Sequence, residues 1–109
     1  MKIARPVDEK VVNPKINKKF GRTPYFAIYE TETKAFNFID NSGNVSQGGA
    51  GIKAAQELVN AKVEAVIVPQ CGENAAKVLR SANITIYKML NDNIVENVEA
   101  LKNGKLEIL

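Results

Sequence analysis

The chain has 109 residues and a formal net charge of +3, from 15 Lys and Arg against 12 Asp and Glu. This length predicts one domain over residues 1–109, since such a chain buries enough surface to fold without disulfides or metals. The small net charge gives no reason by itself to expect a nucleic-acid partner, and the absence of histidine excludes Ser-His-Asp and Cys-His catalysis within the chain.

Hydrophobic periodicity and turn residues divide the chain into strands and helices. Two β-forming runs, beginning at Tyr25 and ending at Ile39, predict an antiparallel hairpin that turns near Glu32. A short, continuously apolar run from Ala65 is typical of a strand buried inside a sheet. The predicted elements are strands at 2–7, 25–31 and 33–39, a helix at 51–61, a strand at 65–69, a helix at 73–82, a strand at 84–87 and a helix at 94–102.

The element order β-β-β-α-β-α-β-α predicts an α/β fold with the ribonuclease H-like motif. Three leading strands form a meander, and each later strand is followed by a helix. Right-handed crossovers place the fourth strand beside the first and the fifth strand outside it. We therefore expect a five-stranded mixed sheet of order 3-2-1-4-5, with strand 2 antiparallel, and three helices.

The predicted strand directions bring four loops to one edge of the sheet. These loops span 8–23, 40–50, 69–73 and 88–93. In open α/β sheets, ligands bind beyond the carboxyl ends of the strands, where the strand order reverses, which is between strands 1 and 4 here. We therefore expect the functional residues on this edge.

Glycines mark the start of two predicted helices at this edge. Gly48, Gly49 and Gly51 open the first helix, and Gly72 opens the second, followed by Asn74. Glycine allows positive φ and close backbone approach, and free amides at a helix start attract anions. These residues are candidate ligand contacts, although glycines before a helix are more often simple turn residues.

Cations and a thiol are predicted at the same edge. The loop at 8–23 contains Lys19 and Arg22, together with Lys10, Lys15 and Lys18. Cys71 lies at a helix N-terminus, a position that lowers the pKa of a thiol. The hypothesis is a site for a small, multiply charged anion, either a cluster or an oxyanion. The ordinary alternatives are a solvated basic loop and a cysteine that belongs to the core.

Cysteine usage and hydropathy indicate a soluble, cytoplasmic protein. Cys71 is the lone cysteine, so no disulfide can form within the chain, which fits a reducing compartment. Residues 1–6 lack the apolar stretch of a signal peptide, and no run approaches the ~18 apolar residues of a membrane span. We therefore expect no membrane partner.

Two motifs carry a resemblance to a known family. They are Phe20-Gly21-Arg22, followed by Pro24-Tyr25-Phe26, and Gly48-Gly49-Ala50-Gly51, supported by Lys2-Ile3-Ala4, Pro6, Gly72, Asn74-Ala75 and Gly104-Lys105-Leu106. With these motifs the chain resembles, over nearly its whole length, the dinitrogenase iron-molybdenum cofactor biosynthesis family, which includes NifX, NafY and the C-terminal region of NifB.

The resemblance implies a non-enzymatic protein that binds or carries an anionic metal–sulfur cofactor, such as an iron–molybdenum cluster or its precursor. It also implies a protein partner in cofactor delivery. The family often has a histidine immediately before Phe-Gly-Arg, where this chain has Lys19, so Cys71 becomes the candidate metal ligand. One thiol cannot supply the several ligands of an assembled iron–sulfur cluster, which favours a preformed cluster. We expect a monomer or a weak homodimer.

Two alternatives stay open. A nuclease of this fold class needs a cluster of carboxylates for divalent metals, whereas Asp8 and Glu9 fall beyond the first strand and Asp40 ends the third. A regulatory or protein-interaction domain of the same fold needs no metal ligand. Its surface would include residues 105–109, whose apolar side chains could pack on the sheet or on a partner.

Overall fold

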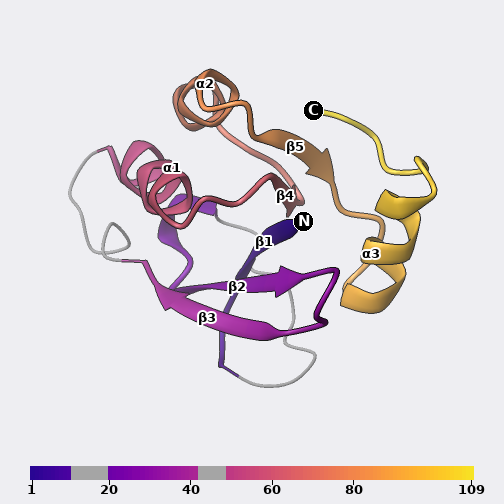
Figure 1. The fold of residues 1–109 in the computed structure, drawn as a ribbon. Coiled ribbons are helices and arrows are strands. Elements are labelled where there is room, and N and C mark those ends of the chain that lie inside the picture. Colours follow the sequence, from indigo (N-terminus) through magenta and orange to yellow (C-terminus); the bar gives the residue numbers. More distant parts are fainter. Residues whose placement is uncertain (11–19, 42–48) are drawn as a thin grey trace.

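The computed structural model describes residues 1–10, 20–41 and 49–109, and within them one mixed β-sheet organises the fold (Figure 1). Its strands lie in the order β3-β2-β1-β4-β5. β2 is antiparallel to both β1 and β3, whereas β4 is parallel to β1 and to β5. The predicted strand order and the antiparallel second strand are confirmed. The strands are β1 (Lys2–Val7), β2 (Tyr25–Glu30), β3 (Phe36–Asp40), β4 (Ala65–Val68) and β5 (Thr85–Lys88).

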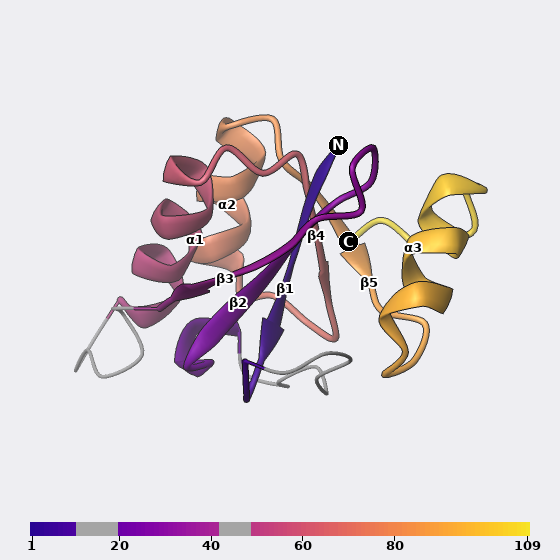
Figure 2. The same ribbon diagram turned by 60° about the horizontal axis from the view of Figure 1, so that its bottom comes forward.

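Helices cover both faces of this sheet (Figure 2). The helices are α1 (Ala50–Asn60), α2 (Glu73–Ser81) and α3 (Ile94–Lys102). β4 shows why they divide between the faces: Val66 packs in the cluster under α1 and α2, whereas its neighbour Ile67 packs with Val98 of α3. Every residue of β4 is buried, as expected of a continuously apolar central strand. None of the helices in the described ranges is long and apolar enough to cross a membrane.

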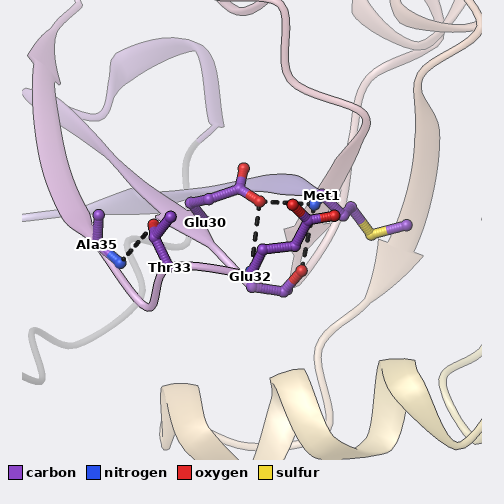
Figure 3. A network of polar contacts seen from close by, with 6 residues as sticks. Met1, Glu30, Glu32, Thr33 and Ala35 are labelled. Atoms are coloured by element: carbon purple, nitrogen blue, oxygen red, sulfur yellow. Dashed lines mark hydrogen bonds and ion pairs between the residues drawn. The ribbon is translucent and has the colours of Figure 1, made fainter.

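The β2–β3 hairpin turns later than the sequence predicts. β3 begins at Phe36 rather than at residue 33, because residues 31–35 form the turn, in which Lys34 has φ 60°. A hydrogen bond of 2.8 Å from the Lys34 N–H to the Glu30 carbonyl closes this turn. Figure 3 shows the polar contacts around it, where the Met1 ammonium nitrogen lies 2.8 Å from Oε1 of Glu30. The start of β1 is thereby tied to the hairpin.

The segment that follows α3 returns to the edge of the sheet at β5. Leu106 is buried in the cluster on the α3 face. The N–H of Lys88 donates to the carbonyl of Glu107 at 2.8 Å, and the N–H of Leu109 donates to the carbonyl of Ile86 at 2.9 Å. Of the two roles expected for residues 105–109, the structure shows packing on the sheet.

Candidate ligand-binding cleft

An open cleft lies where the carboxyl-edge loops meet the first turns of α1 and α2. It has a volume of about 720 Å³ and is lined by the segments 20–22, 49–52 and 70–75. The first of these is the 3₁₀ turn η1 (Phe20–Arg22), which precedes β2. The last follows β4 and leads into α2. The cleft is therefore at the edge where strand directions predict ligand binding, on the face that carries α1 and α2.

The predicted site residues within the described ranges all line this cleft. They are Arg22, Gly49, Gly51, Cys71, Gly72 and Asn74. Lys19 and Gly48 lie outside the described residues, as do Lys15 and Lys18. The lining also includes Phe20, Gln70 and Glu73, which sequence reasoning did not assign. Gln70 lies between β4 and α2, and Glu73 is the first residue of α2; both flank Cys71 and Gly72 in the sequence, and this adjacency is the signal that could have found them.

Two glycines are required by the backbone geometry of the cleft. Gly49, the N-cap of α1, has φ 69° and ψ 21°, a left-handed conformation that strains any residue with a Cβ. A Cβ at Gly21 would lie only 2.8 Å from the backbone nitrogen of Gly51, so η1 packs backbone against backbone on α1. Gly72 differs, because its φ of −66° suits any residue and a Cβ there would meet nothing within 4 Å. Positive φ therefore explains Gly49 but not Gly72.

The first turns of α1 and α2 line the cleft and carry the backbone N–H groups of two helix starts. Both helices begin after a glycine, which has no side chain to accept these hydrogen bonds. The start of α3 differs: Oδ1 of Asn93 accepts a hydrogen bond of 3.0 Å from the N–H of Glu96. First-turn amides have no acceptor within their own helix and carry partial positive charge. The arrangement at α1 and α2 therefore favours an anionic ligand.

Cys71 contributes a half-buried thiol to the cleft. Its side chain packs against the apolar cluster under α1 and α2. Burial raises the pKa of the Cys71 thiol above its ordinary value, and the charge of Arg80 acts in the opposite direction. The predicted lowering of this pKa is therefore wrong, because desolvation by the core outweighs the favourable position at a helix start.

The charges at the edge of the sheet divide into two groups. Arg22 and Glu73 line the cleft and carry opposite charges. Lys10 instead lies 3.1 Å from Oδ1 of Asp40 and 4.9 Å from the ring centroid of Tyr25. Lys10, three residues after β1, therefore lies beside Tyr25 of β2 and Asp40 of β3, and its charge is offset by Asp40. Glu73 stands in the first turn of α2, where a carboxylate complements the helix dipole.

The donor set of the cleft limits the kind of metal it can hold. Among residues 1–10, 20–41 and 49–109, no three His, Cys, Asp or Glu side chains gather in a way that could hold a metal ion. The described lining offers one thiol, one carboxylate and two side-chain amides, from Cys71, Glu73, Gln70 and Asn74, together with backbone amides, which are hydrogen-bond donors. Such a set suits a metal group that already carries its own sulfur or oxygen ligands better than a bare ion.

Fold and cleft together define a class: an α/β protein with a mixed sheet of order 3-2-1-4-5, whose carboxyl edge brings together glycine-led helix starts and a thiol. A model of the family described as "Dinitrogenase iron-molybdenum cofactor" matches residues 1–104. The chain belongs to this dinitrogenase iron-molybdenum cofactor family, as its motifs indicate.

Individual proteins agree with this assignment. An uncharacterized protein of Methanocaldococcus jannaschii is 34% identical over 110 residues, which cover 98% of this chain and 90% of that protein. The solved structure of a putative NifB protein from Thermotoga matches with a TM-score of 0.82 and 30% identity, covering 99% of this chain and 92% of that one. The apo form of the orange protein from Desulfovibrio gigas has a TM-score of 0.91 at 24% identity, over 99% and 92% of the two chains, and shows likeness of fold alone.

Proposed function

We propose that this protein binds a preformed anionic metal–sulfur cluster in the cleft and carries it without catalysing a reaction. The cluster is of the iron–molybdenum cofactor type or a precursor of it. Membership of the dinitrogenase iron-molybdenum cofactor family supports this ligand class, as does the NifB description of the Thermotoga relative. The observation that carries the proposal is the meeting of two glycine-led helix starts and Cys71 in one cleft.

Each part of the cleft has a role in this proposal. The first-turn amides of α1 and α2 donate hydrogen bonds to sulfide or oxide atoms of the cluster. Arg22, at the edge of the cleft, adds positive charge. Cys71 anchors the cluster by coordinating one of its metals through Sγ, and the thiol proton leaves to solvent as that bond forms. Lys19 and Gly48, which lie outside the described residues, are also proposed to contribute.

A second candidate function has its own supporting observation. Leu90, in the segment between β5 and α3, and Val95, in the first turn of α3, are 62% and 61% exposed, which is unusual for large apolar side chains placed close together in the chain. A regulatory or protein-interaction domain with no metal ligand would use such a surface. In the carrier proposal, the same surface would contact the protein that delivers or receives the cluster.

The test uses protein prepared without oxygen. Metal content and the absorption spectrum are measured for wild type and Cys71→Ala. The metal-free protein is then titrated with tetrathiomolybdate. Binding of phosphate and molybdate is measured in parallel by equilibrium dialysis. We expect a charge-transfer spectrum that is weakened in Cys71→Ala. Arg22→Ala should weaken binding, whereas Lys102→Ala, which removes the same charge from α3 outside the cleft, should not.

One combined outcome would reject the carrier function. Wild type that binds none of these anions, with metal-free spectra identical to those of Cys71→Ala, would favour the interaction domain. Size-exclusion chromatography with light scattering then measures self-association directly, for which we expect a monomer or a weak homodimer.

A further inference from the structure

A buried polar pair lies next to the cleft without lining it. Thr23 is fully buried and Asn41 is 2% exposed, and neither is among the lining residues. Thr23 directly follows η1, and Asn41 directly follows β3. We call these two residues the latch. A polar side chain is buried at little net cost only when it is hydrogen-bonded, so the bonds of the latch decide what it holds together.

The bonds of the latch tie η1 to the ends of two strands. The side-chain amide of Asn41 donates to the carbonyl of Gly21 at 3.2 Å and to that of Thr23 at 2.9 Å. The Thr23 hydroxyl donates to the carbonyl of Val7 at 2.8 Å, with the carbonyl of Tyr25 at 3.0 Å as a second acceptor. Since Val7 ends β1 and Asn41 follows β3, η1 is fixed to both strands.

A displacement of η1 would reach the cleft through a backbone contact with α1. A Cβ at Gly21 would lie 2.8 Å from the nitrogen and 3.0 Å from the Cα of Gly51, so the two backbones are in contact with no side chain between them. Gly51 in turn packs toward α2, where a Cβ on it would lie 3.4 Å from the Cβ of Ala75. Close-packed interiors transmit small displacements. A shift of η1 therefore moves the first turn of α1, whose residues line the cleft.

We propose that Thr23 and Asn41 are positioning residues for the ligand site, acting through η1 on Arg22 and on the first turn of α1. This inference rests on the proposed function, because it takes the cleft as the place where the anion binds. A merely structural latch would contribute to stability and leave the geometry of the cleft unchanged. The two roles therefore differ in what a conservative change at Thr23 does to α1.

The experiment compares Thr23→Val, which keeps the shape of the side chain but removes its hydroxyl, with Thr23→Ser, which retains the hydroxyl. Ile67→Val is the matched control, because Ile67 is 1% exposed and packs on the α3 face, away from the cleft. Backbone amide chemical shifts of Gly21 and Gly51 report cleft geometry, thermal unfolding reports stability, and titration with tetrathiomolybdate reports binding. Thr23→Ala replaces Thr23→Val if the latter does not fold.

We expect Thr23→Val to shift both amide signals and to weaken tetrathiomolybdate binding about fivefold, which corresponds to one hydrogen bond. Thr23→Ser should keep the wild-type amide signals and the wild-type affinity. Ile67→Val should lose about as much thermal stability as Thr23→Val but leave the amide signals and the affinity unchanged. Thr23→Val with lowered stability but unshifted Gly51 and wild-type affinity would overturn the inference. If wild type itself fails to bind tetrathiomolybdate, the proposed function is lost, and the Gly51 shift alone decides whether the latch sets the cleft geometry.

Discussion

Gly49 and Gly104 form a matched pair that separates backbone strain from ligand binding. Both have φ 69°, and a Cβ at either position would meet nothing within 4 Å. Gly49 is the N-cap of α1 and lines the cleft, whereas Gly104 follows the C-cap of α3 and does not. Gly49→Ala therefore imposes backbone strain at the cleft, and Gly104→Ala imposes the same kind of strain away from it.

The expected loss of stability follows from two opposing effects. A residue with a Cβ in the left-handed region costs about 1–2 kcal/mol relative to its ordinary conformation. Replacing glycine by alanine also reduces the conformational entropy of the unfolded chain, which raises the free energy of unfolding by about 0.4–1 kcal/mol. Gly49→Ala and Gly104→Ala should therefore each lower the free energy of unfolding by about 1 kcal/mol, which lowers Tm by about 4–8 °C in a domain of this size.

The two variants should differ in binding. Gly49→Ala can relieve its strain by rotating the backbone that leads into α1, and that rotation moves the first-turn amides. Tetrathiomolybdate titration should show at least about a fivefold loss of affinity for Gly49→Ala, as for one misplaced hydrogen bond, and none for Gly104→Ala. Equal affinity in both variants would refute the role of the α1 start. A Gly49→Ala protein as stable as wild type would refute the left-handed conformation itself.

Three further predictions follow from particular residues. Gly21→Ala should lower the free energy of unfolding by about 3 kcal/mol in urea denaturation, since its Cβ would lie 2.8 Å from the backbone of α1; an unchanged midpoint would contradict that contact. Cys71, whose pKa is raised by burial, should react with iodoacetamide with a midpoint at higher pH than a free cysteine; a lower midpoint would show that Arg80 and the helix start prevail. Asn93→Ala should lower the free energy of unfolding by about 1 kcal/mol without altering tetrathiomolybdate affinity, because Asn93 caps α3 outside the cleft; a stability equal to wild type would contradict the cap.

The fold could be predicted from the sequence because its signals are local and mutually consistent. The apolar run of β4 and the helix stripes fix which residues are buried, and the handedness of crossovers then fixes the strand order. The hairpin shows the limit of such signals. Lys34 adopts a left-handed conformation although it is not a glycine, so the turn lacks the residue that usually marks it. The sequence therefore predicts the start of β3 three residues too early.

The position of the cleft could be predicted from the sequence, but its electrostatics could not. Strand directions alone bring the segments at Gly49 and Cys71 to one edge, and both line the cleft. The pKa of Cys71 depends on how deeply the thiol packs into the core, which no local pattern records. The sequence suggests that Lys10 is a cation available to a ligand, whereas in the structure it contacts Asp40 and Tyr25. These contacts form only when the strands pair.

A site made largely of backbone donors depends on placement more than on side-chain identity. In the proposed function the amides of two helix starts provide the hydrogen-bond donors, so the geometry of the site is set by the contacts that fix those helices. Gly21 lets η1 contact α1 directly, and the latch fixes η1 to β1 and β3. The positions most sensitive to substitution should therefore include residues that never touch the ligand. In the proposed carrier function, an open cleft with several hydrogen-bond donors and one sulfur ligand suits a cluster that must leave again, because the bond from Cys71 to the metal can be exchanged for a proton.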